Sequence, residues 1–410
     1  MIGLVKENHL NKALIMLLCV VVYVYRNIEF FVNPVLNQEE GSIFYARAIA
    51  YGYKSMCMPH GGYYQFFQSF ITMLTYLLVP MEYAPWVTSV SSGVVLLIPP
   101  ALILWGRLMI PLDMILKSIL CIMCVTACIP NFTYSVTNSH FVWALAATIV
   151  ILCDDTTSLP KRIIFHVIFL IAGLSVVIPA MLLPVLAYIY YEKKQKYTLW
   201  YTLNIVCTLI VQIVFFIYTH FIKVDDFTHQ VRFTNFDFSY FVYKYTVEAL
   251  CGNFTVHLGD ADRYVGLICM LFFILQAKNI FSNFHTKVLW MCIFCTSIFS
   301  HILSQNMAGG LRYFYVSNLV FFVYLLYNFH MKSRTVFSYL LITLFVFSTI
   351  CNYSKSHILL VEKIKIDWKQ EVKKYKENHG MYNMNIYPIH INADGALTPW
   401  VVPFETKYLQ

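Results

Sequence analysis

The stretch "PWVTSVSSGVVLLIPPALILW" (residues 85–105) contains no charged residue and is long enough to cross a lipid bilayer as a helix. About 20 predominantly apolar residues are needed for that, because each residue adds about 1.5 Å to an α-helix. Similar runs recur along the chain of 410 residues, of which 59% are hydrophobic and only 12% are charged. A soluble domain carries about 25% charged residues. The sequence therefore predicts an all-α polytopic membrane protein.

The basic residues of the short loops predict the orientation of this protein, because Lys and Arg concentrate on the cytoplasmic side. With Lys6 and Lys12 inside, Arg107, the pair at 161–162 and the run "EKKQK" (192–196) also fall inside. The N-terminus is thus expected on the inner, cytoplasmic side of the membrane, and the C-terminus on the outer side. Eleven spans are predicted, at about 10–32, 85–105, 109–130, 139–153, 163–177, 178–191, 198–219, 263–277, 288–304, 313–328 and 335–351.

This orientation requires that "FFQSFITMLTYLLVP" (66–80) does not cross the membrane, so it is expected to be re-entrant or to lie in the interface. Residues 33–84 and 220–262 then form outer loops of a membrane domain that covers 1–351. The charged tail, residues 352–410, is expected to form a small periplasmic cap with one helix, a short strand and a Pro-rich segment.

Two adjacent carboxylates, Glu39 and Glu40, follow the first apolar run in "NQEEGSIFYARAIAYG" (37–52). A helix is expected to begin near Ser42, with Arg47 two turns along the face of Glu40. A carboxylate pair can supply a general base, because each charge raises the pKa of its neighbour. Alternatively, the pair is a solvated helix start favoured by the helix dipole.

A second candidate lies in "QNMAGGLRYFYVSN" (305–318), where Arg312 stands at the entry of a span. An arginine at that depth is costly unless it is paired or binds an anion, and its guanidinium suits phosphate oxygens. Tyr313 beside it is placed at the interface. The alternative is an arginine that anchors the helix by reaching to the membrane surface.

Histidines and aromatic residues mark two further outer loops. The loop "NFTYSVTNSHFVW" (131–143) carries Asn138 and His140, which could contact a phosphate or a sugar hydroxyl. The loop "MPHGGYYQFF" (58–67) carries His60 and Tyr63 around a Gly-Gly pair that permits a tight turn. Ordinary loop and interface roles would explain both groups equally well.

No cofactor is expected. Asp225, Asp226 and His229 could hold a divalent metal, although acidic pairs are common in loops. The net charge of +8 does not indicate nucleic acid, because the basic residues fall in short loops.

The pattern "EEGSIFYARAIAYG…MPHGGYYQFFQSF…VPMEYAPWV" within residues 38–88 resembles the GT-C superfamily of polytopic glycosyltransferases. The predicted spans and the outer tail are similar to those of the bacterial and phage serotype-converting glucosyltransferases that modify O-antigen. "GLRY" (310–313) also resembles an Arg-Tyr feature found late in several such enzymes. This chain has Glu-Glu where many members have an acidic pair that contains Asp.

The resemblance implies transfer of a sugar, expected to be glucose, from undecaprenyl phosphate to a lipopolysaccharide O-antigen acceptor on the periplasmic face. Glu40 or Glu39 would match the acid that deprotonates the acceptor hydroxyl. Arg312 would contact the carrier phosphate, with Arg47 or His140 as further candidates, and His60, Asn138, Tyr63 and Tyr313 would bind substrate. The carrier and the surrounding membrane lipid explain why such an enzyme is embedded in a bilayer.

Two other classes of protein remain open. A flippase or transporter for a lipid-linked sugar would place charged residues deep within several helices, whereas the predicted spans are almost free of charge. An O-antigen polymerase would also span the membrane many times, but would rely on a large outer loop rich in arginine.

Overall fold

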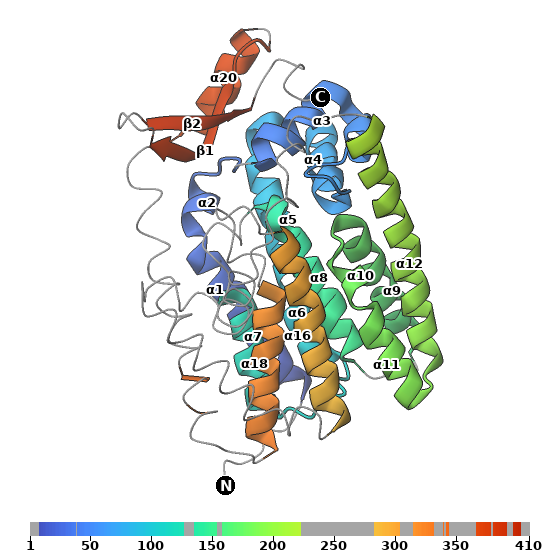
Figure 1. Cartoon of the computed structure of the whole chain (residues 1–410). Coiled ribbons are helices and arrows are strands. Elements are labelled where there is room, and N and C mark those ends of the chain that lie inside the picture. The colour runs from blue at the N-terminus through green and yellow to red at the C-terminus, as the bar shows by residue number, and fades with distance from the viewer. Residues whose placement is uncertain are drawn as a thin grey trace.

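The computed structural model describes residues 8–37, 39–126, 135–153, 158–222, 283–303, 315–331, 339, 342–343, 366–378, 380–391 and 397–402. This part of the chain is mostly helical, and the long helices run side by side in one bundle (Figure 1). Its α-helices are α1 (His9–Arg26), α2 (Ile28–Val32), α3 (Ala46–Tyr51), α4 (Phe66–Leu78), α5 (Ala84–Leu96), α6 (Ile98–Trp105), α7 (Met114–Thr126), α8 (Ser139–Ile151), α9 (Leu159–Ser175), α10 (Ile178–Met181), α11 (Leu183–Lys193), α12 (Lys196–Ile217), α16 (Phe284–Leu303), α18 (Tyr315–His330) and α20 (Trp368–Glu377).

Shorter elements connect these helices. The π-helical segments are η1 (Glu40–Tyr45) and η6 (Tyr218–Ile222), and the 3₁₀ turns are η2 (Gly52–Cys57), η3 (Met81–Tyr83) and η5 (Val136–Asn138). Two strands, β1 (Met384–Ile391) and β2 (Leu397–Val402), form an antiparallel hairpin.

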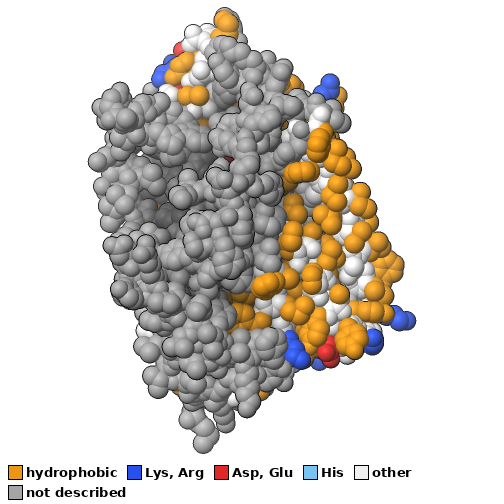
Figure 2. Space-filling model, viewed as in Figure 1, with side chains coloured by type: hydrophobic (Ala, Val, Ile, Leu, Met, Phe, Trp, Pro, Cys, Tyr) orange, Lys and Arg blue, Asp and Glu red, His pale blue; other side chains and the backbone are white. Residues whose placement is uncertain are grey.

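Three helical segments in the described part of the chain are long and apolar enough to cross a membrane: His9–Arg26, Met81–Trp105 and Lys196–Ile217. The outer face of α12 exposes Leu203 and Ile210, and Figure 2 shows hydrophobic side chains spread over that side of the molecule. This surface is suited to contact with lipid. The predicted span 263–277 lies outside the described residues and 335–351 lies almost wholly outside them, so the total of eleven stays a prediction.

Helix boundaries differ from the predicted spans where prolines and caps intervene. The predicted span 85–105 is divided into α5 and α6 at Leu97, and Pro99 lies in the first turn of α6, where its missing N–H costs nothing. The span predicted from residue 109 begins as a helix only at Met114. The reason is that the Asp113 carboxylate accepts a hydrogen bond from the Leu116 N–H (2.9 Å) and so caps the first turn of α7.

The apolar run 66–80, which was expected not to cross the membrane, forms α4, whose 13 residues extend about 20 Å, less than the thickness of a bilayer core. It lies beside α3 at the end of the bundle opposite the junction of α11 and α12 (Figure 1). That junction carries the exposed Lys194 and Lys196 of the predicted cytoplasmic loop. The bundle therefore separates α4 from the basic loop, as the predicted orientation requires.

The C-terminal unit of α20, β1 and β2 packs on the acidic segment after α1. Trp368, Met384 and Ile386 share a buried cluster with Leu36 and Tyr45. The Trp368 indole N–H donates to the Met81 carbonyl (2.9 Å). The predicted helix and strand of the tail are thereby confirmed, and this unit lies at the same end of the bundle as α3 and α4 (Figure 1).

The expected Pro-rich segment of the tail is in fact the second strand. Pro399 pairs with Ile389 in the register of β1 and β2. A two-stranded sheet consists only of edge strands, where a residue without a backbone N–H is tolerated. The prolines of this segment therefore did not prevent strand formation.

The packing of α9 on α12 at Gly173 gives the first prediction. A Cβ at Gly173 would overlap the hydroxyl oxygen of Thr208 and lie 2.7 Å from its Cβ, contacts that real side chains do not make. We expect Gly173→Ala to lower the free energy of unfolding, because overpacking costs about 1–3 kcal/mol whereas the gain in helix propensity is at most about 1 kcal/mol. The thermal unfolding midpoint in detergent measures this. Adding Thr208→Ala should restore part of the loss, and an unchanged midpoint in the single variant would contradict the packing argument.

Candidate functional site

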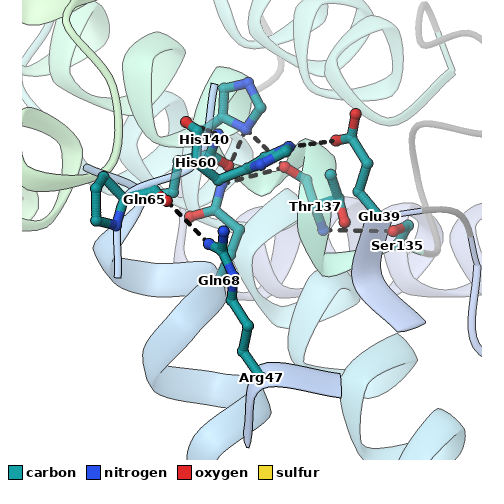
Figure 3. A network of polar contacts seen from close by, with 9 residues as sticks. Glu39, Arg47, His60, Gln65, Gln68, Ser135, Thr137 and His140 are labelled. Atoms are coloured by element: carbon teal, nitrogen blue, oxygen red, sulfur yellow. Dashed lines mark hydrogen bonds and ion pairs between the residues drawn. The ribbon is translucent and has the colours of Figure 1, made fainter. Parts of the chain in front are cut away.

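Three segments that are far apart in the sequence meet at the α3–α4 end of the bundle. They are Glu39 with η1, the turn at 59–65 with the first turn of α4, and η5 with the first turn of α8. We call their polar side chains the outer polar site, after the side of the membrane predicted for these segments: Glu39, Glu40, His60, Gln65, Gln68, Ser135, Thr137 and His140. Figure 3 shows most of these side chains gathered in one place.

The turn that carries His60 depends on two glycines. Gly61 and Gly62 have φ values of 63° and 84°, the left-handed region that glycine adopts without strain. His60 and Tyr63 exchange backbone hydrogen bonds across this turn (3.1 and 3.4 Å). The tight turn predicted from the Gly-Gly pair is thus confirmed.

Buried side chains from the bundle fix this turn in place. The Gln212 amide of α12 accepts a hydrogen bond from the Tyr64 N–H (2.8 Å) and donates to the carbonyls of Tyr64 (3.1 Å) and Gly173 (2.9 Å). The Ser175 hydroxyl accepts a hydrogen bond from the Phe67 N–H (3.2 Å) at the start of α4. The entry to α4 is therefore held against α9 and α12.

The Glu40 carboxylate is buried, with only 2% of the residue exposed. Its Oε2 accepts hydrogen bonds from the Ser135 hydroxyl (2.7 Å) and from the Val136 N–H (3.0 Å). Glu40 therefore joins the acidic segment to the start of α8, and the alternative of a solvated helix start does not apply to it.

Burial raises the pKa of Glu40 to about 7, and hydrogen bonds from Thr88, Ser135 and Val136 only partly oppose this effect. Desolvation is the larger cause because a carboxylate loses its hydration when it is enclosed. Near neutral pH the carboxyl group of Glu40 is thus close to half protonated.

Glu39 occupies a different environment from its neighbour. Its side chain is 29% exposed, and its Oε2 lies 3.8 Å from Nε2 of His60. The His60 side chain is buried and packs edge-on against the Phe44 ring, with the ring centroids 5.6 Å apart. Figure 3 shows the Glu39 carboxylate facing this imidazole. The adjacent glutamates are thus separated into an accessible carboxylate and an enclosed one.

His140 lies on the first turn of α8, within the site, and not in a loop as expected. Its Nδ1 is 2.6 Å from the Thr137 carbonyl and 2.9 Å from the Gln68 amide nitrogen. Gln68 also donates to the Thr137 carbonyl (3.1 Å). The Tyr63 ring stands edge-on to His140, with the ring centroids 6.3 Å apart.

The other predicted site residues are placed as follows. Asn138 is buried at the end of η5, next to Ser135 and Thr137. Arg312 and Tyr313, the candidates for phosphate and substrate contact, lie outside the described residues, as do Asp225, Asp226 and His229.

Two local expectations about the acidic segment were wrong. The helix begins at Glu40 as a π-helix and not near Ser42, and such segments often occur at functional sites. Arg47 was expected on the face of Glu40, but its guanidinium donates to the Pro59 carbonyl (2.9 Å) and so supports the turn of His60. The wider π-helical turn changes the direction of every following side chain.

Gln65, Gln68, Ser135 and Thr137 were missed by reasoning from sequence. Polar residues in the first turn of a helix are common, and nothing in their spacing marks them. The one available signal was that Gln68 lies in an apolar run, where a buried amide needs partners.

For a metal ion, the outer polar site offers Glu39 and His60 as neighbouring ligand types. Within the described ranges, no group of three or more His, Cys, Asp or Glu side chains gathers around one point.

The raised pKa of Glu40 predicts a pH-dependent stability. The folded protein holds this proton up to about pH 7, whereas the unfolded chain releases it near 4.5. Stability should therefore fall as the pH rises from about 4.5 to about 7 and stay level above that, a loss of about 3 kcal/mol at most. Glu40→Gln should remove this component, so that its thermal midpoint exceeds that of the parent at pH 8 and matches it near pH 5. Parallel pH profiles for the two proteins would contradict the burial argument.

Comparison with known proteins identified no relative of this chain. No family model matches the chain, and no curated protein and no solved structure matches it either. The function must therefore be argued from the outer polar site itself.

Proposed function

We propose that the protein is a GT-C-like glycosyltransferase, which moves a sugar, expected to be glucose, from a polyprenyl-phosphate carrier to a hydroxyl of a cell-surface polysaccharide. The observation that carries the proposal is the Glu39–His60 pair, an accessible carboxylate 3.8 Å from a buried imidazole. This pair lies in a polar site at one end of a bundle with helices long enough to cross a membrane. A lipid-linked donor and a water-soluble acceptor can meet only at such a boundary.

Glu39 is the better candidate for the general base. A base must reach the proton that it removes, and the Glu39 side chain is partly exposed. The pKa of Glu40, raised to about 7, would suit a base, but its Oε2 is already occupied by Ser135 and Val136. We therefore assign proton transfer to Glu39 and assign to Glu40 the positioning of the segment that carries it.

In the proposed reaction, the acceptor oxygen attacks the anomeric carbon of the sugar from the side opposite the phosphate. The new carbon–oxygen bond forms as the bond to the carrier phosphate breaks. Glu39 takes the proton of the acceptor hydroxyl, and the polyprenyl phosphate leaves with the bonding electrons. A single displacement of this kind inverts the anomeric configuration.

The leaving phosphate gains negative charge, which a cation at a dry boundary stabilises. Arg312 and His140 are the proposed contacts for this charge. The proposal gives Arg47 a supporting role, because its guanidinium is committed to the Pro59 carbonyl.

A flippase for a lipid-linked sugar is the main competing function. Charged side chains buried among the described helices would favour it, but three of those identified, Glu40, Arg47 and Glu371, lie in the segment after α2 and in the C-terminal tail. Arg26 is the exception: it is 4% exposed within the predicted span 10–32 and donates to the carbonyls of Val125 (3.3 Å) and Thr126 (3.0 Å). A single buried charge that is held by backbone carbonyls favours an enzyme over a transport pathway through the bundle.

Transfer can be measured with membranes that contain the protein, radiolabelled undecaprenyl-phosphate-glucose and lipopolysaccharide as acceptor. We expect Glu39→Gln to lower kcat by about 10²–10⁴-fold, the usual contribution of a general base, and Glu40→Gln to lower it by less than about tenfold. Glu82→Gln is the matched control, because Glu82 lies in the same outer segment and only forms a surface ion pair with Lys376 (2.6 Å).

Each possible result of this assay identifies which part of the proposal is wrong. If Glu40→Gln abolishes transfer and Glu39→Gln does not, the two glutamates have exchanged roles. If both variants transfer as well as the parent, neither is the base. If the parent protein moves labelled lipid across the bilayer without transferring its sugar, the protein is a flippase.

A further inference from the structure

Three buried oxygen atoms of the outer polar site have no hydrogen-bond partner within the described part of the chain. They are Oε1 of Gln65, Oε1 of Gln68 and Oγ1 of Thr137. The three residues are 3%, 0% and 3% exposed. Buried polar atoms in native proteins are nearly always satisfied, so this cluster points to a ligand or to ordered water.

The contacts fix the orientation of one of the two amides. Nε2 of Gln65 donates to the His60 carbonyl (3.2 Å), and rotating this amide by half a turn would place its oxygen against the carbonyl oxygen. The end of the Gln68 amide that lies 3.1 Å from the Thr137 carbonyl is also 2.9 Å from Nδ1 of His140, so either end of this amide can be the one without a partner. The unsatisfied groups are therefore one acceptor, one end of the Gln68 amide and one hydroxyl that can donate or accept.

The hydrogen-bonding capacity of these atoms indicates which class of ligand can satisfy them. A phosphate group at neutral pH supplies acceptors almost exclusively, so it cannot satisfy the oxygen of Gln65. A sugar hydroxyl supplies a donor and an acceptor at once. The cluster thus complements a polyhydroxylated ring, and through the Gln65–His60 contact it lies next to the Glu39–His60 pair.

We propose that Gln65, Gln68 and Thr137 form the subsite that binds the hydroxyl groups of the donor sugar. This proposal rests on the proposed function, because it places the sugar of the lipid-linked donor beside the base. It also assigns the specificity for one sugar over another to neutral groups on α4 and η5 and separates this task from the recognition of phosphate.

The subsite can be tested with the full-length protein in lipid nanodiscs. Binding and transfer are measured for short-chain polyprenyl-phosphate-glucose and for its 2-, 3-, 4- and 6-deoxy analogues. In the parent, we expect removal of at least one hydroxyl to weaken binding and kcat/KM by about tenfold, the usual effect of one lost hydrogen bond. In the Gln68→Met or Thr137→Val variant, replacing the glucose donor by the same deoxy analogue should lower binding and kcat/KM by less than about twofold. The reason is that the protein partner of the removed hydroxyl is already missing.

Thr75→Val provides the matched control. Thr75 is buried on α4 like Gln68, but its hydroxyl donates to the Ile71 carbonyl of its own helix (2.8 Å). This variant should retain the parent's full discrimination against the deoxy analogue. If Gln68→Met fails to fold, Thr137→Val still tests the subsite, because each variant is measured separately.

The result distinguishes the subsite from the proposed function. If the deoxy analogues bind the parent as tightly as glucose does, or if their losses are unchanged in both variants, the three oxygens hold only water and the subsite is refuted. If binding depends on a hydroxyl and this dependence disappears in the variants, the subsite stands even where no sugar is transferred. In that case the proposed transfer reaction fails alone.

Discussion

The carboxylate of Glu40 joins two parts of the chain that lie 95 residues apart, through its hydrogen bond with Ser135. A carboxyl group enclosed at this depth is tolerated only when its oxygens are satisfied, so the acidic segment and the start of α8 have one mutual position. Glu39 and His140 are carried on these two segments. The arrangement of the outer polar site thus follows from one buried interaction, which also positions the partly exposed Glu39 beside the buried His60.

Much of the helical architecture could be predicted from sequence, because lipid requires that backbone polar groups be paired within each helix. The apolar runs located α8 and α12 to within two residues at each end, whereas the first run, 10–32, is divided into α1 and α2 at Asn27. The start of α7 was misjudged because hydropathy does not detect the capping bond of Asp113. The strand at 397–402 was missed because Pro399 conceals it, although a hairpin of edge strands accepts a proline.

The candidate site was predictable only in part. The sequence indicated Glu39, Glu40, His60 and His140 by residue type, and the structure brings them together. It did not indicate which glutamate is enclosed, because a π-helical turn shifts each side chain away from the direction that a regular helix would give it. Gln65 carried no sequence signal and Gln68 only its position in an apolar run, since their relevance depends on contacts with His60 and Thr137. Long-range partners of this kind are invisible to a local pattern.

The close approach of Gly41 to the C-terminal hairpin has a consequence for biosynthesis. A Cβ at Gly41 would lie 2.7 Å from Cδ1 of Ile386, so the acidic segment and β1 fit against each other without space between them. The ribosome produces Gly41 long before it produces Ile386. The growing chain therefore carries its acidic pair without this hydrophobic cover during most of translation, and the packing around η1 can be completed only after nearly all of the protein has been made.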